Sequence, residues 1–122
     1  MQVPAQITFR HMDVSPALQA RIQERIDELE QYCNRITACR VTVEPEHRSH
    51  QQGNLFRISI DLVVPGREIT IKRGSGVNHA HEDPYVAVRD AFDALRRRLE
   101  DHVREGRGQV KAHAAPPPKE AR

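Results

Sequence analysis

Arginine side chains are the groups whose type and spacing best fit a chemical role in this chain. One side of a helical segment near the C-terminus carries Arg89, Arg96 and Arg97, away from the segment's apolar stripe. A planar guanidinium binds phosphate through two parallel hydrogen bonds and also stacks on nucleobases. Arg25, on an earlier helical segment, lies beside them if both helices pack on one face of a sheet. A surface of this kind is able to bind nucleic-acid phosphates without reading sequence.

The alternative interpretation of this arginine-bearing side is a solvated helix face that has no ligand. The same helix carries carboxylates that are able to neutralise the arginines: Asp90, Asp93, Glu100 and Asp101. Mixed charge of this kind is typical of an exposed helix. The two interpretations differ in whether phosphate or carboxylate is the main partner of the guanidinium groups.

Two further cations, Lys72 and Arg73, close the last expected strand. The same end of the expected sheet holds the hairpin loop with Arg48 and the N-termini of both helices. Unpaired backbone N–H groups make helix N-termini attractive to phosphate, so we predict a second nucleic-acid contact there. Ordinary edge-strand charge that discourages aggregation explains these cations equally well.

Four histidines lie on the two loops at this end of the expected sheet: His47, His50, His79 and His81. Imidazoles from two loops are able to bind zinc or copper, and Glu82 is adjacent. Their spacing fits no standard metal cage, however. We therefore expect no metal and no cofactor, and keep a metal-binding module as an alternative function.

Catalytic chemistry has little support in the sequence. No nucleophile motif or carboxylate pair is recognisable, and Gly74-Ser75-Gly76 lacks the remaining glycine of a nucleotide-binding loop. Cys33 falls on an apolar helix stripe, where a cysteine packs as a small hydrophobic residue. Cys39 is the second of only two cysteines, and reduced thiols are expected. We predict that the protein is cytoplasmic and is not an enzyme.

The composition limits the core to a modest, aliphatic one. Apolar residues make up 38% of the 122-residue chain and charged residues 30%, with no tryptophan. The net charge of +2 is small, so any affinity for nucleic acid must depend on where the arginines lie. No apolar run is long enough to span a bilayer, and no membrane partner is expected. We expect one domain over residues 1–108 and a disordered, proline-rich tail over 109–122.

Hydrophobic periodicity predicts six elements in the order β-α-β-β-β-α. Alternation predicts strands over Gln6–Arg10, Cys39–Glu44, Phe56–Val64 and Glu68–Lys72. Apolar residues at helical spacing predict helices over Ser15–Asn34 and Asp83–Glu105. Each helix opens with a capping residue followed by proline, and the second is expected to end at Gly106 and Gly108.

This order predicts a two-layer α/β fold of the α+β type. Neither helix is able to bury its apolar stripe alone, so both should cover one face of a four-stranded mixed sheet. The first two strands are joined through a helix, which makes them parallel and the crossover right-handed. The later strands should form an antiparallel meander.

The two helical segments also carry a resemblance to a known family. Leu29-Glu30-Gln31-Tyr32, followed by Arg35-Ile36, resembles the helix exit of the ribosome hibernation promoting factor family, also called ribosome-associated inhibitors or sigma-54 modulation proteins. The segment Asp83-Pro84-Tyr85-Val86-Ala87-Val88 is similar to the family's Asp-x-Tyr-x-Ala-Ile helix opening. The continuation of that helix matches at Asp93, Leu95, Arg97, Leu99 and His102.

The resemblance implies a protein that binds the small ribosomal subunit between head and body, in the channel for messenger and transfer RNA. There it would stop translation during stress or stationary phase. The expected partner is ribosomal RNA rather than DNA, and the protein is expected to be a monomer off the ribosome. The residues expected to bind RNA are Arg25, Lys72, Arg73, Arg89, Arg96 and Arg97. The alternative is a general RNA-binding or metal-binding module not tied to the ribosome.

The chain also departs from the family pattern. Family members usually carry lysine at the positions of Glu28, Ala94, Asp101 and Val103. The loop over residues 74–82 is longer than usual, and the dimerisation domain of the long forms is not expected here. These departures reduce the basic surface and leave more of the binding to arginine.

Overall fold

The computed structural model describes residues 2–46, 55–73 and 83–114, without the side chains of Glu46, Leu55 and 107–114. Its elements follow the expected order, β-α-β-β-β-α. They are β1 (Gln6–Phe9), α1 (Pro16–Tyr32), β2 (Ala38–Glu46), β3 (Leu55–Val64), β4 (Arg67–Arg73) and α2 (Pro84–Ala114). All six predicted elements are therefore present.

The four strands form one mixed sheet in the order β1-β2-β3-β4. β1 pairs with β2 in parallel, with Ile7 opposite Val41. β2 with β3, and β3 with β4, pair antiparallel. The parallel pair and the antiparallel meander confirm the topology predicted from the helical crossover and the turn residues.

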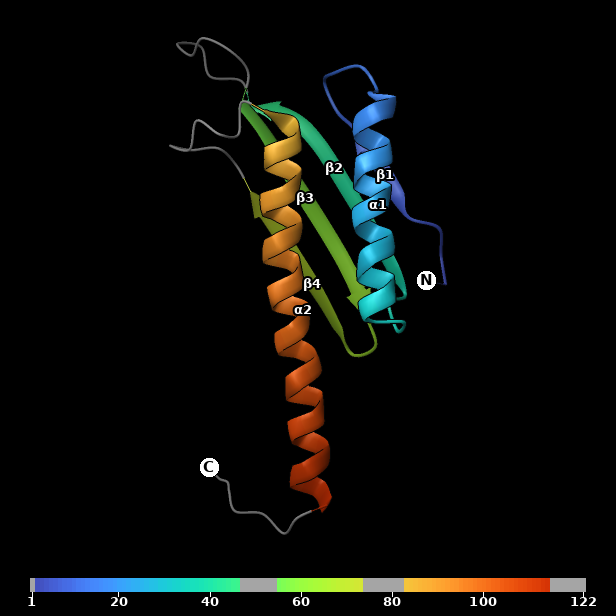
Figure 1. The fold of residues 1–122 in the computed structure, drawn as a ribbon, viewed down its shortest axis with the longest axis vertical. Helices are drawn as coiled ribbons and strands as arrows, with labels where there is room; N and C mark the ends of the chain where they lie inside the picture. Colours follow the sequence, from blue (N-terminus) through green and yellow to red (C-terminus); the bar gives the residue numbers. More distant parts are fainter. Residues whose placement is uncertain (1, 47–54, 74–82, 115–122) are drawn as a thin grey trace.

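Both helices lie side by side on one face of the sheet and run in the same direction (Figure 1). They begin at the end of the sheet where β2 ends and β3 begins, as the crossover connections require (Figure 1). Among the described residues, no helix lies over the opposite face of the sheet (Figure 1). The sequence-based expectation that both helices cover one face is thus confirmed.

The core lies between this face and the helices, and it is built mainly from aliphatic side chains. One row across the sheet holds Ile7, Val41, Ile60 and Ile71, and the last three are buried. Alternation places the next residues of each strand on the open face, which explains the period of two in the sequence. Each fully buried aliphatic side chain contributes about 1.5–3 kcal/mol relative to an exposed one.

The start of α1 follows from its capping residue. The Ser15 hydroxyl accepts a hydrogen bond from the Leu18 backbone N–H at 3.2 Å, and Pro16 occupies the first helical position. The predicted stripe is buried along the helix: Leu18, Ile22, Ile26 and Leu29. Burial of this stripe fixes the rotation of α1 on the sheet.

The start of α2 was predicted correctly, but its end was not. The Asp83 carboxylate accepts a hydrogen bond from the Tyr85 backbone N–H at 2.9 Å, just before the helix. The helix then continues through Gly106 and Gly108 to Ala114, past the end of the sheet (Figure 1). A glycine inside a helix costs only about 1 kcal/mol relative to alanine, so it does not by itself end one. The expected tail boundary at residue 109 falls within α2, and residues 115–122 of that tail lie outside the described residues.

Gly66 and Gly106 differ in backbone conformation, and this difference generates a prediction. Gly66 lies in the turn between β3 and β4 with φ +82°, a conformation that an L side chain adopts only with strain. Gly106 is helical, and no atom within 4 Å would meet an added Cβ at either position. Gly66→Ala should therefore lower the free energy of unfolding by about 1–2 kcal/mol. Gly106→Ala should raise it, by up to about 1 kcal/mol.

Urea unfolding of the two variants beside the parent protein measures both changes. The two substitutions add the same methyl group in open space, so each controls for the other. If α2 ended at Gly106 in a left-handed cap, Gly106→Ala would instead be destabilising, and the helix end described above would be wrong.

Candidate nucleic-acid interface

The two parallel helices meet along a line that we call the interhelical seam. Its charged and aromatic side chains include Arg21, Arg25 and Tyr32 of α1 with Tyr85 and Arg96 of α2. Because the helices run in the same direction, successive turns of α1 face successive turns of α2. The seam therefore brings together residues that lie far apart in the sequence.

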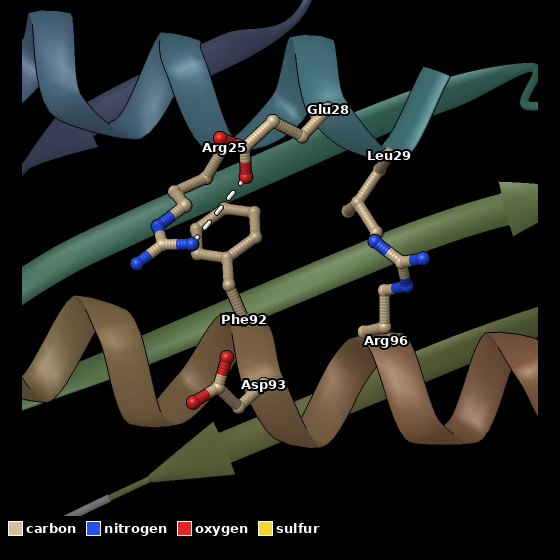
Figure 2. A pocket seen from close by; sticks show the side chains of 6 residues that line it. All are labelled: Arg25, Glu28, Leu29, Phe92, Asp93 and Arg96. Carbon is tan, nitrogen blue, oxygen red and sulfur yellow. Dashed lines mark hydrogen bonds and ion pairs between the residues drawn. The ribbon is translucent and has the colours of Figure 1, made fainter. Parts of the chain in front are cut away.

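A small pocket lies in the middle of the interhelical seam (Figure 2). It is lined by Arg25, Glu28, Leu29, Phe92, Asp93 and Arg96. Figure 2 shows Arg25 reaching toward Phe92 from α1, while Arg96 reaches from α2 toward Leu29. The pocket volume of about 60 Å³ is far below the ~300–1,000 Å³ of small-molecule sites. A pocket of this size holds one small group, such as a phosphate, rather than a cofactor, and the carboxylates of Glu28 and Asp93 balance its two arginines.

Two arginine–tyrosine stacks lie along the interhelical seam, and each joins one helix to the other. The Arg96 guanidinium carbon lies 4.5 Å from the centre of the Tyr32 ring. The Arg21 guanidinium carbon lies 5.4 Å from the centre of the Tyr85 ring. The arrangement is reciprocal, because each helix supplies one arginine and one tyrosine. A cation over an aromatic face at an exposed site contributes about 0.5–1 kcal/mol.

Carboxylates accompany the arginines, as the solvated-face interpretation predicts. Arg89 pairs with Asp90 at 3.1 Å, and Arg96 pairs with Glu100 at 3.2 Å. In the pocket, Arg25 Nη1 lies 3.3 Å from Glu28 Oε1. Exposed ion pairs of this kind contribute about 0–1 kcal/mol, so a phosphate is able to replace the carboxylate at low cost. The pairing therefore does not decide between the two interpretations.

The predicted arginines of the helices fall into two groups. Arg25 and Arg96 meet in the pocket of the interhelical seam. Arg89 and Arg97 lie on the exposed side of α2, where helical spacing places them next to Arg96. All four are thus on the helix-bearing side of the molecule.

The structure does not bring Lys72 and Arg73 into one cluster. Both are exposed at the end of β4, where Lys72 is opposite Ser59 and Arg73 is opposite Ile58. Because Ile58 is buried under the helices, Arg73 is on the helix side of the sheet and Lys72 is on the open side. Arg48, expected near them, lies outside the described residues.

Comparison with known proteins decides the family. Residues 5–107 match the family described as sigma 54 modulation protein / S30EA ribosomal protein. The chain belongs to this family. The match spans every strand, all of α1 and α2 up to residue 107, so it includes the whole interhelical seam.

Two relatives carry the name of ribosome hibernation factors. The ribosome hibernation promotion factor of Deinococcus radiodurans is 30% identical over 95 residues, which are 77% of this chain and 46% of that protein. The ribosome hibernation promoting factor of Azotobacter vinelandii is 31% identical over 96 residues, covering 79% of this chain and 78% of that protein. The chain therefore spans about half of the first relative and most of the second.

Two solved structures share the fold. A ribosomal subunit interface protein from Coxiella burnetii has a TM-score of 0.64 at 17% identity, and the match covers 80% of this chain and 94% of that one. The N-terminal domain of Thermus thermophilus Protein Y has a TM-score of 0.63 at 16% identity, covering 84% of this chain and 99% of that one. At this identity the comparison shows the fold and no more.

Sequence reasoning missed Arg21 and the structural role of both tyrosines. Tyr32 and Tyr85 served only as parts of the motifs that resemble the family. A signal was present, because Arg21, Arg25, Glu28 and Tyr32 recur at spacings of four, three and four. This is a second helical stripe beside the apolar one, and it marks the side of α1 that meets α2.

The histidine hypothesis remains untested. The loop residues His47, His50, His79, His81 and Glu82 lie outside the described residues. Within residues 2–46, 55–73 and 83–114, no three His, Cys, Asp or Glu side chains are grouped so that they could hold a metal ion. Across the same ranges, none of the helices is both long enough and apolar enough to cross a membrane.

Cys39 is buried in the core and is unsuited to nucleophilic chemistry. Burial is the largest cause that raises the pKa of its thiol, and with the negative charges of Asp61 and Glu30 it takes this pKa from 9.0 to about 12. The thiolate is the nucleophilic form of cysteine, so Cys39 stays protonated and inert near neutral pH. Its position on the core side of β2 explains the burial.

The raised pKa of Cys39 predicts a loss of stability in alkali. The folded-state pKa of about 12 lies above the ordinary value of 9.0, so the unfolded chain loses the proton first. The contribution is fully present below pH 9.0 and is lost as pH rises toward about 12. The free energy of unfolding, measured by urea titration across this range, should therefore fall more steeply for the parent protein than for Cys39→Ala.

The variant corrects for the other groups that titrate in alkali, such as tyrosine and lysine. Absolute stability will also differ because the substitution leaves a cavity. The slope against pH is therefore the quantity to compare, and equal slopes would contradict the raised pKa.

Proposed function

We propose that this protein binds the small ribosomal subunit in the channel for messenger and transfer RNA and halts translation there during stress. Membership of the family, with relatives named as ribosome hibernation factors, is the observation that carries the proposal. The partner is ribosomal RNA and not DNA or a membrane, and the chain acts as a cytoplasmic monomer without enzymatic activity.

The chemistry of the interhelical seam supports this proposal. Arg25 and Arg96 reach into a pocket of phosphate size, and Arg89 and Arg97 continue the cationic surface along α2. Rigid helices hold these guanidinium groups in place, which suits contacts to a folded RNA backbone. The carboxylates in exposed ion pairs with Arg25, Arg89 and Arg96 are the groups that phosphates would replace.

The low net charge of +2 implies that binding depends on local contacts more than on long-range attraction. Reversing a few arginines should therefore have a large effect. Lys72 and Arg73 lie on opposite sides of β4, so we propose that they contribute less to RNA binding than the helix arginines. Of the two, Arg73 is on the side of the sheet that carries the helices.

We predict that replacing Arg89, Arg96 and Arg97 together by glutamate abolishes co-sedimentation with the small ribosomal subunit. Each reversal removes a phosphate partner and adds a repulsive charge. For the parent protein, the logarithm of the association constant should fall with the logarithm of salt concentration by about one for each phosphate neutralised. Milder replacement of the three residues by glutamine should reduce that slope by up to about three.

Arg98→Glu is the matched control for the charge reversals. Arg98 is exposed on the same helix, about half a turn from Arg96 and away from α1. Arg98→Glu should leave co-sedimentation with the small ribosomal subunit nearly unchanged. Absence of the parent protein from ribosomal fractions of starved cells at low salt would overturn the proposed function. Recovery with free structured RNA would favour a general RNA-binding module instead.

We predict that the segment after Gly108 is dispensable for translation inhibition. The family match ends at residue 107, and the arginines named above all precede it. Truncation after Gly108 removes the last residues of α2, none of which is an expected RNA contact. Inhibition of cell-free translation should therefore stay within about twofold, whereas a loss of about 1.4 kcal/mol in binding free energy would weaken binding tenfold. Loss of inhibition in the truncated protein, with its fold intact by circular dichroism, would show that this segment takes part in binding.

A further inference from the structure

We infer that Tyr32 and Arg96 form a stacking site for an unpaired RNA base at one end of the interhelical seam. This inference rests on the proposed function and deepens it. Phosphate contacts alone do not distinguish single-stranded RNA from a duplex. A stacking site adds recognition of unpaired bases to this surface. The ligand class is an unstacked nucleobase in a loop, a bulge or a strand end.

Exposure of Tyr32 is the first observation behind this site. Tyr32 is the last residue of α1, and 38% of it is exposed. Other large apolar residues of the helices are mostly buried in the core. An exposed aromatic ring on a rigid helix end offers a flat apolar surface, to which a nucleobase binds by stacking.

The position of Arg96 is the second observation. Its guanidinium lies over the Tyr32 ring, 4.5 Å from the ring centre, and its Nε donates a hydrogen bond to Glu100 at 3.2 Å. These two contacts hold the planar guanidinium in a fixed orientation while its side chain stays 45% exposed. The ring and the guanidinium therefore form a preformed platform that binds both the face of a base and the phosphate next to it.

The stack at the other end of the interhelical seam shows what a purely structural pair looks like. Arg21 lies over Tyr85 at 5.4 Å, but Tyr85 is half-buried and packs against the hydrophobic core. That stack joins the helices and offers little ring surface. The two ends share one interaction and differ in exposure, so only the Tyr32 end is suited to a ligand.

Such a site predicts which RNA the seam prefers. Bases in a duplex are already stacked and paired, whereas loops and ends present free faces that stack on aromatic and guanidinium groups. Any base is able to stack on an aromatic side chain, and the stacking is lost when that side chain is removed. The protein should therefore bind single-stranded RNA more tightly than duplex RNA of equal length.

The test compares two probes that differ only in their bases. One is a single-stranded oligouridine, and the other is an abasic ribose-phosphate strand of the same length. Tyr32→Leu keeps an apolar side chain but removes the ring, and it should weaken oligouridine binding at least about fivefold. It should leave the salt dependence unchanged, because no phosphate contact is lost, and should leave abasic binding unchanged. Tyr32→Phe should restore the affinity for oligouridine.

Fluorescence gives a second readout that a structural role of Tyr32 would not move. The chain has two tyrosines and no tryptophan, so in Tyr85→Phe the only tyrosine is Tyr32. Oligouridine should quench its fluorescence, and the abasic strand should not. Tyr85→Leu, which removes the structural stack, serves as the matched control and should bind both probes as the parent protein does.

Equal binding of oligouridine by Tyr32→Leu and the parent protein would overturn the stacking site. So would equal losses on both probes, or failure of the parent protein to bind oligouridine. These outcomes are separate from failure of the proposed function, which appears as absence of the parent protein from ribosomal fractions. Circular dichroism of Tyr32→Leu confirms that a loss of binding does not come from unfolding.

Discussion

Burial of one sheet face under two parallel helices is the interaction on which the rest of this structure depends. Four strands supply rows of mostly β-branched side chains, and each helix supplies one apolar stripe. Neither helix covers the whole face, so the two must lie next to each other. This packing determines which side chains lie on the outer surface of the helices. The buried core side chains therefore fix the position of the interhelical seam.

The elements that depend on local sequence could be predicted well. Alternation located all four strands, and Ser15 and Asp83 with their following prolines marked both helix starts. The crossover between β1 and β2 determined that these strands are parallel. The end of α2 could not be read in the same way, because Gly106 is compatible with a helix as well as with a cap and the sequence does not give its φ angle.

The candidate site could be predicted only in part, since its geometry arises between elements. Helical spacing placed Arg89, Arg96 and Arg97 near one another, and a second stripe on α1 marked the side that meets α2, but neither pattern showed which turns of the two helices would face each other. The stacks of Arg96 on Tyr32 and Arg21 on Tyr85 depend on the offset between the helices. That offset is set by core packing, which no single helix sequence contains. The opposite directions of Lys72 and Arg73, in contrast, follow from strand alternation alone.

The composition of the interhelical seam has one more consequence, which concerns folding. One wall comes from α1 and the other from α2, with three strands between them in the sequence. The two sides of the interhelical seam therefore lie next to each other only in the folded chain. A partner that contacts both walls binds the folded state alone, and mass action then stabilises the fold by an amount that grows with partner concentration. A partner bound at the interhelical seam would thus protect the protein from thermal unfolding and from proteolysis for as long as it stays bound.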